Sequence, residues 1–166
     1  MNYHPLPQPE ELPKKEKEDA MGAYMMMFAA VAVGLPLPII NLLAAIIYYY
    51  VNKSSSRFVR FHSLQSLLSS LPLTIMNGIG LFWSLRILFT DEWSLNNIYL
   101  GYIGMLFIVN ILYYIMGILA AIKAYKGRMF YYWFFGQMCY HIAFQIKEND
   151  SDESPVILNR PPNQLQ

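Results

Sequence analysis

The sequence predicts an all-α fold, a polytopic membrane bundle with three to four transmembrane helices. Two observations predict it. Hydrophobic residues make up 55% of the 166 residues and charged residues only 14%, against about 25% in an average soluble domain. The charges are also absent from long stretches: there is none in 20–52, and 61–122 holds only Arg86, Asp91 and Glu92. A soluble domain needs charge on each element to keep its surface hydrated, so these elements are expected to face lipid.

The chain divides into a polar tail over 1–19, a helical membrane domain over 20–146 and a second polar tail over 147–166. Both tails are rich in charged residues or proline and cannot bury enough apolar surface to fold alone, so we expect them to be disordered. The apolar run after the first tail is about twice the length of a signal-peptide core. We therefore expect a retained membrane segment and no cleavable signal.

The membrane domain contains four hydrophobic segments, at about 20–51, 61–89, 98–122 and 129–146. A helix needs about 20 residues to cross a bilayer core. The first segment is longer and contains Gly34–Pro38, where two prolines predict a kink or a break. The fourth has 18 residues and carries Gln137, His141 and Gln145 on one line. It either spans or lies at the interface, and the pattern leaves both open.

Basic residues predict the orientation. They gather in the first connection (Lys53, Arg57, Arg60) and in the third (Lys123, Lys126, Arg128), whereas the second connection holds Asp91 and Glu92. The positive-inside rule then places the first and third connections in the cytoplasm. The first tail lies outside if the first segment crosses once, and in the cytoplasm if that segment re-enters at its break. Both alternatives stay open.

Polar side chains line one face of the second segment when it is placed on a helix. His62 and Gln65 begin this face, which continues through Ser66, Ser69, Ser70 and Asn77. Two interpretations compete: helix packing through small polar residues, or one wall of a hydrated pathway. In the third segment, Asn110, Gly117 and Ala121 form a face on which two helix backbones could approach closely, a candidate packing seam.

The run before the second segment places cations next to aromatic residues. Arg57, Arg60, His62 and Gln65 form the candidate interaction or lipid-binding cluster, since juxtamembrane cations attract anionic head groups. The alternative is that the cations only set topology. Arg86, near the end of its segment, is expected to reach the opposite interface as an anchor.

No sequence pattern indicates catalysis. Zinc-protease, phosphate-loop and serine-elbow motifs are absent, and every carboxylate lies in a tail or a turn. We therefore expect no enzyme activity, no cofactor and no metal site. Cys139 is the single cysteine and is expected to be a buried apolar side chain. The net charge of +1 gives no reason to expect nucleic acid as a partner.

Two motifs resemble the Tic-type family of chloroplast inner-envelope import components and its small bacterial relatives. They are Arg57-Phe58-Val59-Arg60-Phe61-His62-Ser63-Leu64-Gln65-Ser66-Leu67 and Gly117-Ile118-Leu119-Ala120-Ala121-Ile122-Lys123-Ala124-Tyr125-Lys126-Gly127. The resemblance covers about Gly34 to Gly136. It implies a helical protein of three or four spans, and the plastid relatives are implicated in protein translocation.

Motifs and composition together predict a multi-pass protein of the cytoplasmic membrane. The resemblance implies a non-catalytic subunit that assists protein translocation or membrane assembly. Its expected partners are membrane lipids and other membrane subunits or further copies of itself. The alternative function is a small channel or carrier with a polar pathway lined by the second segment.

Overall fold

The computed structural model describes residues 3–32, 37–90 and 96–146. Their helices, in chain order, are α1 (Lys14–Met25), the short 3-10 helix η1 (Met26–Phe28), α2 (Ala29–Ala32), α3 (Pro38–Asn52), α4 (Arg57–Phe89), α5 (Asn97–Tyr125) and α6 (Phe135–Phe144). The all-α prediction is confirmed for this part of the chain. Its one element of β pairing is an isolated antiparallel bridge between Tyr3 and Gln145.

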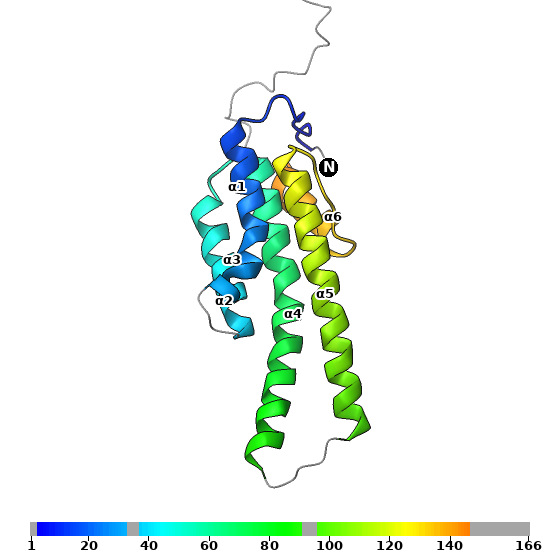
Figure 1. The fold of residues 1–166 in the computed structure, drawn as a ribbon. Helices are drawn as coiled ribbons and strands as arrows, with labels where there is room; N and C mark the ends of the chain where they lie inside the picture. The colour runs from blue at the N-terminus through cyan, green and yellow to red at the C-terminus, as the bar shows by residue number, and fades with distance from the viewer. Residues whose placement is uncertain (1–2, 33–36, 91–95, 147–166) are drawn as a thin grey trace, which may run out of the picture.

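Two long helices, α4 and α5, run side by side as an antiparallel hairpin (Figure 1). Each begins at a polar cap. At the start of α4, the Ser56 side chain accepts a hydrogen bond from the Val59 backbone N–H. At the start of α5, the Asn96 side chain accepts a hydrogen bond from the Tyr99 backbone N–H. These caps satisfy N–H groups that a helix start leaves unpaired. Helix α5 ends before Gly127, whose φ of 71° is the left-handed conformation that glycine favours at a helix end.

Helices α4 and α5 are long and apolar enough to cross a membrane. Their 33 and 29 residues correspond to about 50 and 43 Å, more than a bilayer core of about 30 Å. Within the most apolar 18-residue stretch of each helix, only 6% of α4 and 22% of α5 is buried inside the protein. A core helix of a soluble protein would be mostly covered, so these two helices mark a membrane protein.

The first hydrophobic segment forms a second hairpin instead of a single crossing. From α1 the chain passes through η1 and α2, and α3 then returns alongside them (Figure 1). The Tyr48 hydroxyl donates to the Asp19 carbonyl at 2.7 Å, and the Ala30 N–H donates to Asn41 Oδ1 at 2.8 Å. The start of α1 and the end of α3 therefore lie at the same end of the molecule. Of the break expected over Gly34–Pro38, residues 34–36 lie outside the described part of the chain.

The prediction of three to four spans is wrong for the described residues, which contain two candidate spans. Helix α3 has 15 residues and α6 has 10, or about 22 and 15 Å, both shorter than the bilayer core. In the fourth segment, residues 129–134 precede α6 and are not helical. Apolar residues of the first and fourth segments pack in a core at one end of the long hairpin. Hydrophobicity alone does not distinguish such core residues from those of a membrane span.

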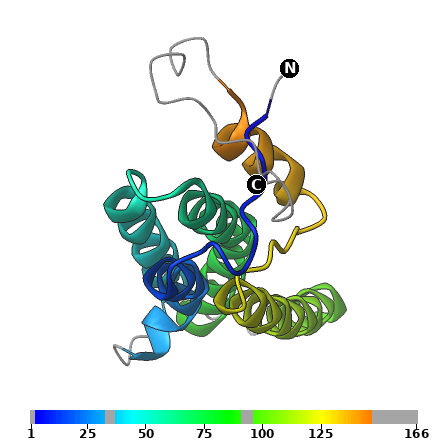
Figure 2. The same ribbon diagram turned by 90° about the horizontal axis from the view of Figure 1, so that it is seen from above.

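That core lies where α1, α3 and α6 surround the first turns of α4 and the last turns of α5 (Figure 2). One buried cluster joins α1, α4 and α5 around Tyr24, Phe58 and Ala121. A second joins α4 and α6 around Phe61 and Phe144. We call this end of the molecule the cap.

The first tail contributes to the cap, although the sequence predicts a disordered tail over 1–19. Helix α1 begins at Lys14, and Leu12 is buried against it. The Tyr3 hydroxyl lies 2.7 Å from His141 Nδ1, and the His4 N–H donates to the Phe144 carbonyl at 2.9 Å. These few aromatic and apolar residues find partners that only the folded cap provides. The second tail, from residue 147, lies outside the described residues.

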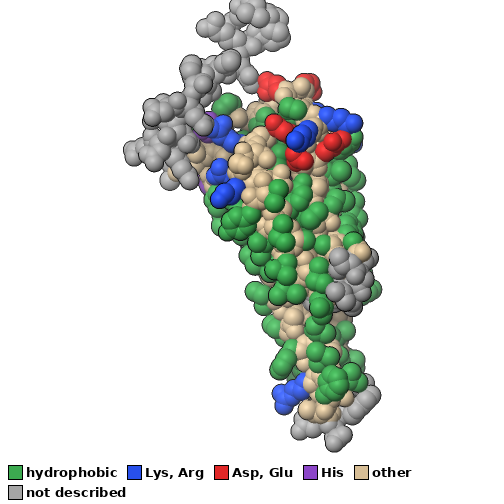
Figure 3. Space-filling view, turned by 90° about the vertical axis from the view of Figure 1, so that its left-hand side faces the viewer, with side chains coloured by type: hydrophobic (Ala, Val, Ile, Leu, Met, Phe, Trp, Pro, Cys, Tyr) green, Lys and Arg blue, Asp and Glu red, His purple; other side chains and the backbone are tan. Residues whose placement is uncertain are grey.

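The surface separates into a charged end and an apolar body. Acidic and basic side chains gather at the end that carries α1, and hydrophobic side chains cover most of the face below it (Figure 3). On α4 the large exposed apolar side chains begin at Leu71 and continue to Phe89. This stretch of 19 residues is about 28 Å long, which matches one bilayer core.

Candidate functional site

A buried polar network crosses the cap and contains His62 and Gln65 of the candidate interaction cluster. Gln65 donates from Nε2 to the Tyr24 hydroxyl at 2.9 Å and to the Phe130 carbonyl at 2.8 Å, and its Oε1 accepts from the Tyr132 N–H at 3.2 Å. The Tyr24 hydroxyl lies 2.9 Å from His62 Nδ1. Three segments, α1, α4 and the loop before α6, are therefore joined by one amide and one phenol.

The network pairs the His62 imidazole with the Tyr24 phenol. Because Tyr24 accepts the Gln65 hydrogen, its own proton is free to point at His62 Nδ1, which then acts as an acceptor. In this arrangement His62 is a neutral imidazole with its proton on Nε2. That atom is buried and has no hydrogen-bond partner among the described residues, and the Phe58 and Phe61 rings lie edge-on to the imidazole. Burial raises the pKa of the Tyr24 hydroxyl well above its ordinary value, so the phenol also stays neutral.

The structure separates the candidate interaction cluster. His62 and Gln65 are fully buried and cannot contact lipid or a partner. The two arginines are half-buried. Arg60 donates from Nη2 to the Ile142 carbonyl at 3.0 Å, which ties α4 to α6. Helical periodicity places these residues correctly on one face of α4, but it cannot show that the cap covers that face.

The serines of the polar face are used within the protein. The Ser66 hydroxyl donates to the Ala23 carbonyl of α1 at 2.7 Å. Ser69 and Ser70 donate to carbonyls three residues earlier in α4, and Ser66 and Ser70 are buried. Asn77 and Asn110 exchange two hydrogen bonds of 3.1 and 2.8 Å between α4 and α5. The face is therefore mostly a packing surface.

The candidate seam on α5 lies against the first hairpin. Gly117 and Ala121 are buried, and a Cβ at Gly117 would overlap the end of the Met27 side chain. Small residues at these positions let η1 and α1 approach the α5 backbone. Asn110 lies two turns earlier in α5, where it pairs with Asn77.

Helix α6 carries Cys139 and His141. Cys139 is fully buried, as predicted, and burial raises the pKa of its thiol to about 12. His141 lies on the other side of the helix, next to the Tyr3 hydroxyl. Among the described residues there is no group of three or more His, Cys, Asp or Glu side chains that could hold a metal ion.

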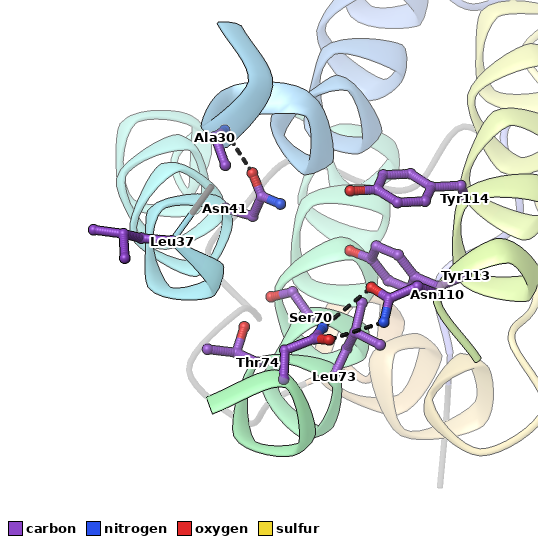
Figure 4. A pocket seen from close by; sticks show the side chains of 10 residues that line it. Ala30, Leu37, Asn41, Ser70, Leu73, Thr74, Asn110, Tyr113 and Tyr114 are labelled. Atoms are coloured by element: carbon purple, nitrogen blue, oxygen red, sulfur yellow. Dashed lines mark hydrogen bonds between the residues drawn. The ribbon is translucent and has the colours of Figure 1, made fainter. Parts of the chain in front are cut away.

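A cavity of about 220 Å³ opens below the cap, between the tip of the first hairpin and the long helices (Figure 4). Its polar lining comes from three helices: Asn41 of α3, Ser70, Thr74 and Asn77 of α4, and Asn110, Tyr113 and Tyr114 of α5. The sequence analysis did not identify Asn41, Thr74, Tyr113 and Tyr114 as site residues. Asn41 carried a signal, because it is the one amide in the apolar segment 20–51.

The sequence model of the MamF/MmsF family, described as the magnetosome magnetite crystal formation protein family, matches residues 18–139. This match covers well over half of the chain. The protein belongs to the MamF/MmsF family. No curated protein and no solved structure matches the chain.

Membership in the MamF/MmsF family corrects the resemblance to Tic-type import components, and with it the assignment to protein transport. Neither the translocation role nor the alternative channel or carrier role stands. The two motifs behind the resemblance lie in the cap, at the start of α4 and the end of α5. There they supply the polar network and the small residues that allow close helix contact. Such residues are needed wherever helices pack closely, so their presence does not distinguish import proteins from other membrane proteins.

Proposed function

We propose that this protein acts in magnetite crystal formation as a resident of the magnetosome membrane. The observation that carries the proposal is the MamF/MmsF family match over residues 18–139, which includes both candidate spans and most of the cap. The sequence alone predicts the cytoplasmic membrane. The family's description supports the more specific location.

We further propose a non-catalytic role. The polar side chains best suited to chemistry, Tyr24, His62 and Gln65, are enclosed in the cap and hydrogen-bonded to one another. What the protein presents outward is a long apolar hairpin with a folded cap at one end. This architecture suits a protein that holds a structured domain against one membrane face, with lipids and other membrane proteins or further copies as partners.

Complementation tests the location and the process. The chain is expressed in a magnetite-forming host that lacks its resident family member, and crystal size is measured by electron microscopy. We expect larger and more regular crystals than in the deletion strain, together with recovery of the protein in the magnetosome fraction. The control is an unrelated membrane protein of two spans, expressed at the same level. Crystals that stay as in the deletion strain, with the protein present at normal levels in the membrane, would contradict the proposal.

The same complementation assay, repeated with the His62→Asn variant, tests the non-catalytic role. Asparagine can place its side-chain oxygen where Nδ1 accepts from Tyr24, so the network is retained without an imidazole. We expect this variant to restore crystal formation as the unmodified chain does. If it is stably folded but inactive, His62 has a chemical role and the non-catalytic proposal is wrong.

A further inference from the structure

The cavity below the cap lies between helices whose outer faces are apolar. Ser70, Thr74 and Asn77 line it from α4, and the lipid-exposed part of this helix begins at Leu71. Exposed apolar side chains also cover α3 and α5 on either side of it. The cavity therefore opens within the apolar surface that faces lipid.

Three polar groups in this cavity have no hydrogen-bond partner among the described residues. They are the side-chain N–H₂ of Asn41 and the hydroxyls of Thr74 and Tyr114. Figure 4 shows the Asn41 amide and the Tyr114 hydroxyl directed toward the space between α3 and α5. At membrane depth, polar groups without a partner are unfavourable. A bound molecule that accepts hydrogen bonds would remove that cost.

Two of these groups are already held in place. Asn41 is oriented by the bond that its Oδ1 accepts from the Ala30 N–H at 2.8 Å. The Tyr114 ring stacks on Phe28, with centroids 5.5 Å apart and planes 18° from parallel. Donors fixed before binding lose little freedom when a ligand arrives, which favours affinity.

The lining also defines the charge of the ligand. It contains amides, hydroxyls and apolar side chains, and none of its residues is Lys, Arg, Asp or Glu. An ionised phosphate or ammonium group would find no opposite charge there, whereas ester carbonyls and hydroxyls would find matching donors. A volume of about 220 Å³ exceeds the roughly 30 Å³ that one water molecule occupies in the liquid. Exposed Leu37 at the rim offers an apolar surface next to the polar interior.

We propose that this cavity binds the uncharged glycerol and ester region of a neutral glycerolipid, a diacylglycerol. The three donors, from Asn41, Thr74 and Tyr114, hydrogen-bond its carbonyl and hydroxyl oxygens. Its acyl chains leave along the exposed faces of α3 and α4, past Leu37. The site does not depend on the role in crystal formation, so either proposal can fail alone.

Native mass spectrometry of the full-length protein in detergent tests the site. The protein is titrated with dioleoylglycerol and, separately, with dioleoylphosphatidylglycerol. We expect one retained diacylglycerol per chain. The double variant Thr74→Val/Tyr114→Phe removes two donors while it keeps side-chain shape, and we expect its apparent Kd to rise at least about tenfold, or about 1.4 kcal/mol.

The control is Ser84→Ala/Tyr99→Phe. It removes a serine and a tyrosine hydroxyl that lie 2.9 Å apart near the other end of the same two helices, and its affinity for diacylglycerol should be unchanged. A second variant, Thr74→Met, fills the cavity and should also block binding, which guards against misfolding of the double variant. Equal affinities in cavity and control variants, preference for the anionic lipid, or no diacylglycerol adduct at all would overturn the proposal. In the last case the cavity would hold water.

Discussion

At the scale of single residues, the Tyr24 hydroxyl connects the first hairpin to the long one. It accepts from Gln65 Nε2 and is hydrogen-bonded to His62 Nδ1, so its removal leaves both partners incomplete inside a closed core. A buried group that loses its partner bears the desolvation cost without a compensating bond, typically about 1–3 kcal/mol. The ring itself contributes packing in the same cluster, which a phenylalanine would preserve.

We therefore expect Tyr24→Phe to lower stability by about 1–3 kcal/mol, measured as a lower Tm by tryptophan fluorescence in detergent. Tyr50→Phe is the matched control, because Tyr50 is 63% exposed and substitutions at such sites usually change stability by less than about 0.5 kcal/mol. Equal Tm values for the two variants would show that the network does not stabilise the cap.

The residues of the candidate site show what helical periodicity can predict. It groups Ser66, Ser70 and Asn77 correctly on one face of α4, and all three make hydrogen bonds there. It cannot show that the start of this face lies under α1, while the stretch after Ser70 lines a cavity. Burial of that kind depends on which helices fold back over α4, and this is decided by contacts between residues far apart in the sequence.

At the scale of elements, the long hairpin could be predicted and the short one could not. The expected segments 61–89 and 98–122 agree with α4 and α5 to within a few residues at each end, because a long apolar run has few alternatives to a helix. Helix α4 even continues through Pro72. The segment 20–51 is also apolar and free of charge, but it forms the second half of α1, then η1, α2 and α3. Its return brings Tyr48 close to Gly22, a contact that hydrophobicity does not encode.

Substitution of Gly22 tests this contact. A Cβ at Gly22 would overlap the Tyr48 hydroxyl and lie 3.1 Å from its Cζ, while that hydroxyl is bonded to the Asp19 carbonyl. Gly22→Ala should therefore separate α1 from α3 and lower the Tm, although alanine is the better helix former. Gly78→Ala is the control, since nothing lies within 4 Å of a Cβ there. It should leave stability unchanged or raise it by up to about 1 kcal/mol.

The double variant Gly22→Ala/Tyr48→Phe separates the two causes. Removal of the hydroxyl relieves the overlap, so part of the lost stability should return. If Gly22→Ala proves as stable as Gly78→Ala, the close approach of α1 and α3 does not determine the fold of the first hairpin.

At the scale of the whole molecule, the cap and the apolar belt together decide the topology. The hairpin α4–α5 brings the start of α4 and the end of α5 to one face of the membrane. The first hairpin returns to that same face, because Asp19 and Tyr48 are bonded there. Of the two alternatives that the sequence leaves open for the first tail, the structure favours the one in which the first segment re-enters. The tail then lies on the side of the basic connections.

Cysteine labelling tests this topology. Glu10→Cys and Ser54→Cys place a thiol in the first tail and the first connection, and Asn96→Cys places one at the start of α5. All three positions are exposed. In sealed vesicles of known orientation, we expect a membrane-impermeant maleimide to label Glu10→Cys and Ser54→Cys from one side and Asn96→Cys from the other. The native Cys139 should stay unlabelled, because it is fully buried and the pKa of its thiol is raised to about 12. Labelling of Glu10→Cys from the side of Asn96→Cys would mean that the first segment crosses the bilayer, and the cap could not form as described.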